Sequence, residues 1–107
     1  MLIAGGRDKG QDFSPCREQV KRRTRHVVLI GEGAPAIERA WDGASMERAG
    51  SLDEAVARAF AAAQGASGRR VVLLSPGCAS FDMFKDYEDR GARFRDAVAR
   101  LSRKAAA

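Results

Sequence analysis

The sequence predicts an α/β sandwich with a mainly parallel sheet. Three short apolar runs, at 2–4, 26–30 and 71–74, have the pattern of strands that are covered on both faces. The segments between them carry helical patterns and are long enough for the crossovers that parallel strands require. Strands that alternate with helices in this way favour one sheet between two layers of helices.

Length and composition restrict the chain to one small domain. It has 107 residues, of which 45% are apolar, enough for a core and too many for a disordered tail. No apolar run approaches the ~18 residues of a membrane span, and the N-terminus lacks the pattern of a secretory signal. Two cysteines are too few for a disulfide scaffold or a zinc site. We therefore expect a cytoplasmic globular protein with no membrane partner.

The first strand is predicted at Leu2–Ala4, directly before Gly5-Gly6. Almost nothing precedes this strand, and chain ends fray unless they are tied down, so we expect a chain that is cut inside a larger fold. The polar segment 7–13 is expected to be a loop.

The first helix and second strand follow this loop. Ser14 is expected to be the N-cap and Pro15 the first helical residue, with the helix reaching about Arg23. Val20 is its main apolar anchor. The run His26–Ile30 is the second strand, rich in β-branched residues.

The middle of the chain contains a turn, a short helix and a weak strand. The turn is Gly31-Glu32-Gly33, and the helix runs from Pro35 to about Trp41. Residues 44–47 are predicted to be a short strand.

A capping box predicts the start of the next helix, because Ser51 is followed three residues later by Glu54. Gly65 is expected to end this helix in a left-handed conformation. Its core-facing residues are spaced mainly four apart and are Leu52, Val56, Phe60 and Ala63.

The last strand is predicted at 71–74, buried on both faces, and it passes into a loop of small residues, 75–80. A final helix follows, with arginines on its outer face. Its core-facing residues are Phe94, Val98 and Leu101.

The net charge of +5 is concentrated in two short clusters. Residues 17–25 carry a local charge of +4 and residues 100–104 carry +3, which leaves −2 for the rest of the chain. Nucleic-acid binding favours basic residues joined on one face with aromatic residues between them, and neither cluster contains an aromatic residue. We expect solvated helix faces and no nucleic-acid partner.

Ligands of open parallel sheets bind at the carboxyl ends of the strands, where this chain has loops at 5–12, 31–35 and 75–80. The second loop formally matches G-x-G-x-x-A, with Glu47 or Asp53 as the acidic residue further along. However, Glu32 adds a negative charge to it and Pro35 lacks an N–H donor. A plain tight turn is the alternative that we favour.

The other two loops carry groups suited to anions. Lys9 projects a flexible cation after two glycines, although an exposed, solvated lysine is an equal alternative. The loop 75–80 offers backbone N–H groups and hydroxyls, with aromatic residues after it. Cys78 lacks an evident base, so we do not expect a catalytic thiol. The single histidine, His26, is expected to be a satisfied core or strand-edge residue.

Three motifs carry a resemblance to a known family: GGRDKG at 5–10, DFSP at 12–15 and LLSPGCASFDMFKDYEDRG at 73–91. Together they resemble the C-terminal domain of the Mur ligases that add D-glutamate in peptidoglycan synthesis. The resemblance runs from Leu2 to about Leu101, so residues 1–104 are assigned to a partial domain and 105–107 to a tail. It implies a three-layer, Rossmann-like sandwich that lacks the first strand and helix of that domain.

The resemblance also implies which residues bind D-glutamate. Lys9 matches the lysine that pairs with a carboxylate of D-glutamate, Ser80 and the backbone of Phe81 match the loop for its side-chain carboxylate, and Tyr87 matches an aromatic wall. Leucine is common where Phe81 stands, and an aliphatic residue where Cys16 stands. Residues of the supporting loops are Gly5, Gly6, Asp8, Ser75, Cys78 and Ala79.

By the same resemblance, the intact enzyme uses ATP and Mg²⁺ to form an acyl phosphate on UDP-N-acetylmuramoyl-L-alanine, which the amine of D-glutamate attacks. This chain has no G-x-x-x-x-G-K-[ST] loop to hold ATP phosphates and lacks the metal-binding and uridine-nucleotide domains. We expect no catalytic residue and no metal site in this chain, no activity of the chain alone, and a monomer.

Two other functions remain open at this point. One is a free-standing α/β module that binds a nucleotide or another anion through the loop 31–35. The other is a basic interaction module, for which binding to nucleic acid would weaken steeply with salt.

Overall fold

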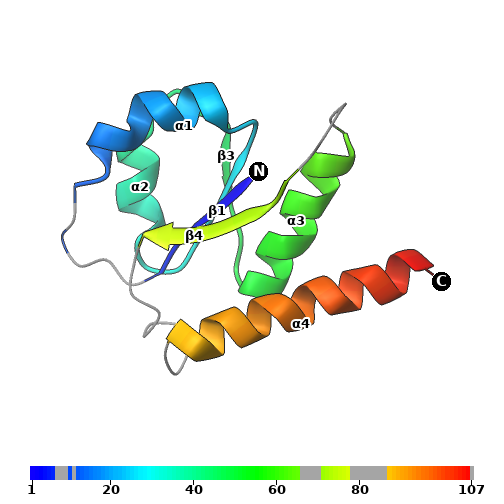
Figure 1. Ribbon diagram of the computed structural model, residues 1–107. Helices are drawn as coiled ribbons and strands as arrows, with labels where there is room; N and C mark the ends of the chain where they lie inside the picture. The colour runs from blue at the N-terminus through cyan, green and yellow to red at the C-terminus, as the bar shows by residue number, and fades with distance from the viewer. Residues whose placement is uncertain (7–9, 11, 66–70, 78–86, 107) are drawn as a thin grey trace.

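The computed structural model describes residues 1–6, 10, 12–65, 71–77 and 87–106 (Figure 1). Within these ranges, side chains are described for all residues except 75–77, 87 and 102–106. In the described part of the chain, no helix is both long and apolar enough to cross a bilayer.

The described strands form one sheet in the order β3-β2-β1-β4, and every neighbouring pair is parallel. This arrangement confirms the predicted fold class. The strands are β1 (Leu2–Gly5), β2 (Val27–Ile30), β3 (Met46–Arg48) and β4 (Leu73–Gly77). β3 lies slightly after its predicted position at 44–47.

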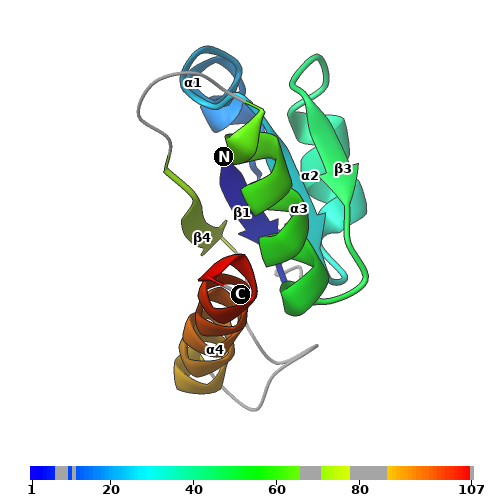
Figure 2. The same ribbon diagram turned by 90° about the vertical axis from the view of Figure 1, so that its right-hand side faces the viewer.

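Helices cover both faces of the sheet, which gives three layers. α1 (Arg17–Arg23) and α2 (Ala34–Ala40) pack on one face, and α3 (Leu52–Gln64) and α4 (Tyr87–Ala106) pack on the other. In Figure 1 α4 runs across one end of α3, and Figure 2 views α4 nearly along its axis, beside that end. Because β2 lies between both layers, all four of its residues are fully buried.

The N-terminus of α3 is capped as predicted, with one difference. The Ser51 hydroxyl accepts from the Glu54 backbone N–H at 3.1 Å. The Glu54 carboxylate reaches back one residue further than a standard capping box and accepts from the Gly50 N–H at 3.0 Å. The predicted left-handed cap at the other end is wrong, because Gly65 has a right-handed conformation with φ −78°.

The start of the first helix also differs from the prediction. Residues Ser14–Cys16 form a 3₁₀ turn, and α1 begins at Arg17. Ser14 does not cap the helix, because its hydroxyl and its N–H both donate to the Asp12 carboxylate. These hydrogen bonds, the hydroxyl's first, hold the pKa of Asp12 below its usual value. Cys16 stands where the resembling family usually has an aliphatic residue, but its side chain is exposed, at the junction of the two helical segments.

The predicted burial of 71–74 on both faces is wrong. Val72 and Leu74 pack beneath α3 and α4, whereas Val71 and Leu73 are 58% and 55% exposed. β4 is an edge strand, and none of the described residues of this segment joins the core beneath α1 and α2.

The core-facing stripe of α4 differs by one residue from the prediction. Phe94, Ala97 and Leu101 pack toward α3, and Ala97 is only 4% exposed. Val98 is 41% exposed. Among the described residues α4 packs mainly on α3, so its apolar stripe is narrow, and Val98 lies beside it.

A polar network fixes β3 to its neighbours. The Nε2 atom of His26 donates to the Glu47 carboxylate at 2.5 Å, and its Nδ1 atom lies 2.8 Å from the Ser45 hydroxyl. Arg58 of α3 donates to the other Glu47 oxygen at 2.6 Å. His26 is therefore a hydrogen-bonded residue at the strand edge, as expected. The hydrogen bond from His26, and next that from Arg58, holds the pKa of Glu47 below its usual value.

We expect Glu47→Gln to lower the free energy of unfolding by about 1 kcal/mol at pH 7, because it removes the charge that both partners contact. A carboxyl group whose pKa is lowered by folding stabilises the protein above its unfolded-state pKa of 4.5 and loses that effect as the pH falls through the folded-state value. The difference in the free energy of unfolding between wild type and Glu47→Gln should therefore become smaller as the pH falls. Urea unfolding from pH 7 to pH 3 measures it.

Glu18→Gln is the control, because Glu18 is an exposed glutamate whose nearest cation, on Arg17, is 3.9 Å away. It should change stability by a few tenths of a kcal/mol at most. An equal effect of both variants, or a gap that widens in acid, would contradict the account of the network.

Candidate functional site

The carboxyl ends of β1 and β2 meet in a very tight contact. Gly5 has φ +128°, and a Cβ atom on it would lie 2.0 Å from the Ile30 carbonyl oxygen. The Gly6 N–H donates to that oxygen at 3.0 Å, and the Gly6 carbonyl accepts from the Gly33 N–H at 2.6 Å. The first residues after β1 are thus held against the turn after β2, and we call these contacts the glycine junction.

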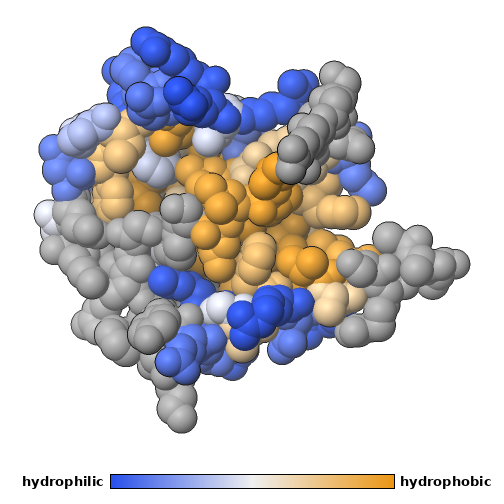
Figure 3. Space-filling view, in the orientation of Figure 1, coloured by the Kyte–Doolittle hydropathy of each residue, from blue (hydrophilic) through white to orange (hydrophobic). Residues whose placement is uncertain are grey.

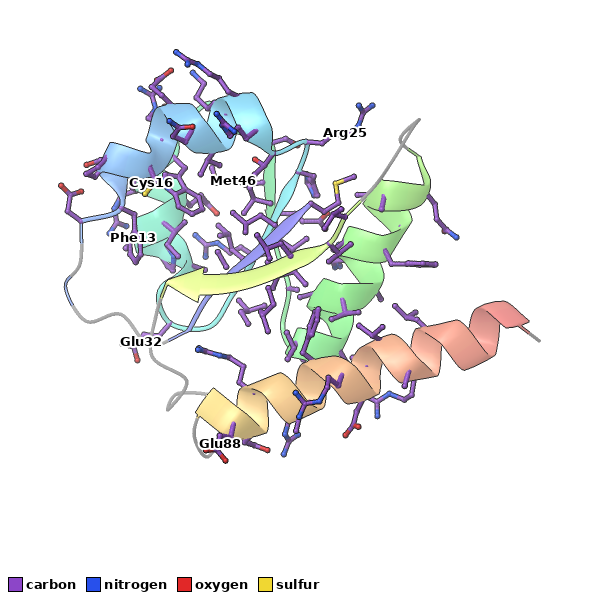
Figure 4. All side chains as sticks on the ribbon, in the orientation of Figure 1. Phe13, Cys16, Arg25, Glu32, Met46 and Glu88 are labelled. Atoms are coloured by element: carbon purple, nitrogen blue, oxygen red, sulfur yellow. The ribbon has the colours of Figure 1, made fainter. Side chains whose placement is uncertain are left out.

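The far end of the first loop is also anchored, at Trp41, the C-cap residue of α2. The Trp41 indole N–H donates to the Phe13 carbonyl at 2.8 Å, and the two rings meet edge to face with centroids 6.3 Å apart. Figure 4 shows Phe13 beside α2. The segment that contains Lys9 is therefore bounded by a fixed point at each end, although Lys9 and Asp8 themselves lie outside the described residues.

β4 brings the start of the third loop to the same edge of the sheet. Gly77, its last residue, pairs with Gly5 in the sheet. The register between the two strands shifts between Ile3 and Gly5, which gives β4 an extra residue near Pro76. Bulges of this kind recur at sheet edges and beside functional sites, and an edge strand tolerates a proline.

The structure therefore places the predicted site only in part. Gly5, Gly6 and the backbone of Ser75 lie at or near the carboxyl edge, and Tyr87 is the first residue of α4, with its side chain undescribed. The remaining predicted residues lie outside the described part of the chain and stay predictions: Lys9, Asp8, Cys78, Ala79, Ser80 and Phe81.

The glycine-rich turn after β2 is poorly suited to hold a pyrophosphate. The Gly33 N–H already donates to Gly6, the Ala34 N–H donates to the Gly31 carbonyl at 3.3 Å, and Pro35 has no N–H. Glu32 is exposed at this end of the sheet, where Glu88 also lies near the start of α4 (Figure 4). These features favour the reading of the turn as a structural element over a nucleotide cradle.

The two basic clusters lie on different layers of the fold. The cluster at 17–25 includes α1, on one face of the sheet, and the cluster at 100–104 lies on α4, on the other. Within the described residues, Arg17 donates to the Asp42 carbonyl and Arg100 to the Asp53 carboxylate. The clusters therefore do not join into one basic surface.

Some polar contacts were not predicted from the sequence. The contact of His26 with Glu47 requires the register of β2 against β3, and the hydrogen bond from Gly33 to Gly6 requires the pairing of β1 with β2. The described residues contain no cluster of three or more His, Cys, Asp or Glu side chains arranged to hold a metal ion.

The known proteins that the chain most resembles in this comparison share one name. No protein-family model matches the chain. It is 54% identical over 103 residues to the UDP-N-acetylmuramoylalanine–D-glutamate ligase of Aromatoleum aromaticum, 52% identical over 101 residues to that of Trichlorobacter lovleyi and 48% identical over 102 residues to that of Coxiella burnetii. Each match covers 94% of this chain and 22% of the relative, so the chain spans about a fifth of the length of these relatives. These matches confirm the resemblance to the D-glutamate-adding Mur ligases.

The glycine junction predicts a specific requirement for glycine at position 5. Gly5→Ala should lower the free energy of unfolding by on the order of 3 kcal/mol or more, because its Cβ would clash with backbone that cannot move aside. In a domain of this size that loss lowers Tm by more than 10 °C, roughly. Thermal unfolding followed by circular dichroism measures it.

Gly10→Ala is the matched control. Gly10 also has a positive φ, +77°, but nothing lies within 4 Å of the Cβ that an alanine would add. It should cost about 1 kcal/mol, from backbone strain alone. If the two variants were equally destabilised, the close approach at Ile30 would not be the reason for Gly5.

Proposed function

We propose that this chain, which is homologous over 94% of its length to UDP-N-acetylmuramoylalanine–D-glutamate ligases, forms the part of such a ligase that binds D-glutamate. On this proposal it is the C-terminal part of a cytoplasmic enzyme of peptidoglycan synthesis. The observation that carries the proposal is the pairing of Gly5 with Gly77, because the two segments with the implied binding residues leave the sheet from this pair.

The chemistry of the implied residues suits an amino acid with two carboxylates. Lys9 follows Gly5 by four residues, and its ammonium group would pair with one carboxylate. Ser80 follows Gly77 by three residues, and its hydroxyl, with the backbone N–H of Phe81, would donate to the other. A contact to backbone does not depend on the side chain, so phenylalanine in place of the more common leucine leaves it possible. Tyr87 would form a wall of the site.

The fold supports such a site because it holds both ends of the segment that contains Lys9. The glycine junction fixes the start of the segment with Lys9, and the contact of Trp41 with Phe13 fixes its end. Less conformational entropy is then lost when the segment binds a ligand. The other residues of the two loops, including Asp8, Cys78 and Ala79, are assigned a supporting role.

The phosphoryl chemistry belongs, on this proposal, to the rest of the longer enzyme. The assignment of ATP and Mg²⁺ to the rest of the enzyme is supported by two features of this chain: its sequence has no phosphate-binding loop of the G-x-x-x-x-G-K-[ST] type, and the Gly33 and Ala34 amides of the turn at 31–35 donate within the fold. The role of this chain is to present the amine of D-glutamate to an activated carboxylate of UDP-N-acetylmuramoyl-L-alanine. We propose that the chain alone is inactive.

Titration of the ¹⁵N-labelled chain with D-glutamate tests the binding role. We expect shifts of the amides of Gly5, Gly6 and Gly77 and of the residues that follow them, and smaller or no shifts with L-glutamate. Lys9→Ala should weaken binding about tenfold or more, because it removes a charge-assisted hydrogen bond. No D-glutamate-dependent hydrolysis of ATP is expected.

Lys21→Ala is the matched control, since Lys21 is an exposed lysine on α1. Equal weakening by both lysine variants, or equal shifts with both enantiomers, would contradict the proposal. Shifts of Gly31 and Gly33 on addition of ATP would favour a nucleotide-binding module instead.

A further inference from the structure

Helix α2 holds both ends of the segment 7–12. Its N-cap residue, Gly33, donates its backbone N–H to the Gly6 carbonyl at 2.6 Å, directly before the segment. Its C-cap residue, Trp41, donates its indole N–H to the Phe13 carbonyl at 2.8 Å, directly after the segment. The two ends of one helix therefore determine where this segment begins and where it ends.

The two anchor residues of α2 are closer together than the chain between Gly6 and Phe13 could reach. Trp41 follows Gly33 by eight residues, over which a helix rises about 12 Å. Phe13 follows Gly6 by seven residues, which could extend to about 23 Å. The anchor at Phe13 therefore excludes many positions that a chain of this length could otherwise reach, and the sequence places Lys9 within it.

Trp41 is itself fixed by the core beneath α1 and α2. Its side chain is buried there, and its backbone N–H donates to the Ile37 carbonyl at 2.9 Å. The Trp41 carbonyl accepts from the Ala44 N–H at 3.0 Å. In Figure 3, hydrophobic residues lie below the hydrophilic residues of α1, in the region that α2 occupies in Figure 1. All of these contacts are made within the chain, so they do not depend on the rest of the longer relatives.

Phe13 is held from more than one side. Its carbonyl accepts from the Cys16 N–H at 3.1 Å as well as from the indole of Trp41, and its ring meets the indole edge to face. Because the carbonyl already has a partner in Cys16, the need to satisfy that oxygen does not explain the second hydrogen bond. A buried indole N–H needs an acceptor, and here the acceptor is the residue at the end of the segment. The contact therefore ties the segment to α2.

We propose that Trp41 is a positioning residue for D-glutamate. Through Phe13 it restricts the segment that carries Lys9, and it thereby raises the affinity for the carboxylate that Lys9 would pair with. This inference rests on the proposed function of the chain. A loop that is restricted before binding loses less entropy when it binds a ligand. By linkage, bound D-glutamate in turn stabilises the contact between Trp41 and Phe13.

Trp41→Phe tests this role, because it keeps an aromatic ring and removes only the N–H donor and part of the ring volume. It should weaken the binding of D-glutamate about three- to tenfold in the amide titration. Because Trp41 acts through Lys9, the same substitution should have no further effect on affinity in a chain that already carries Lys9→Ala. A general loss of stability would weaken binding in both backgrounds.

The wild-type chain offers a second readout that needs no variant. Trp41 is the single tryptophan of the chain, so its indole N–H gives one resonance in the spectrum of the ¹⁵N-labelled protein. D-glutamate should slow the exchange of this proton with solvent, and L-glutamate should slow it less.

Val56→Ala is the matched control. Val56 is buried in the core on the other face of the sheet, under α3, so its truncation should destabilise the fold at least as much as Trp41→Phe and leave the affinity unchanged. If the wild-type chain binds no D-glutamate, the proposed function is wrong, and the role of Trp41 with it. If Lys9→Ala weakens binding but Trp41→Phe does not, if Val56→Ala weakens it equally, or if the indole exchange does not change, only the role of Trp41 is overturned.

Discussion

The close approach of Gly5 to the Ile30 carbonyl is the constraint on which the rest of the structure depends. It leaves no room for a side chain at position 5, and it brings the backbone of Gly6 within hydrogen-bonding distance of both Ile30 and Gly33. The loops after β1 and β2 are therefore joined at their bases. Because Gly5 also pairs with Gly77, the same point fixes where the chain leaves β4. One contact thus fixes where the described chain leaves β1, β2 and β4.

Much of the fold could be predicted because the signals are local. The buried run 27–30 and the capping residues Ser51 and Glu54 each act within a few positions of the chain. Errors arose where a neighbour decides the outcome. A short apolar run looks the same in a central strand and in an edge strand, so the exposure of Leu73 depends on which strand lies outside β4. The exposure of Val98 depends in the same way on how α4 packs against α3.

In the candidate site, too, the local features could be predicted and the contacts between distant segments could not. Its loops could be located from the sequence, because parallel strands end at one edge and the motifs after β1 and β4 are distinctive. The sequence could not show which backbone N–H groups of these loops already donate hydrogen bonds within the fold. The turn at 31–33 matches a nucleotide fingerprint by spacing, yet the Gly33 N–H donates to the Gly6 carbonyl, a residue far away in the chain. Through that hydrogen bond, the turn at 31–33 holds the start of the loop after β1 in place.

A structure of the chain determined with D-glutamate tests the central claim most directly, because it locates the ligand relative to the glycine junction. The account predicts D-glutamate at the carboxyl edge of the sheet, between the segments that follow Gly5 and Gly77, with one carboxylate on Lys9 and the other on Ser80 and the Phe81 amide. Density for the ligand at the turn 31–33, or anywhere away from this edge, would contradict it.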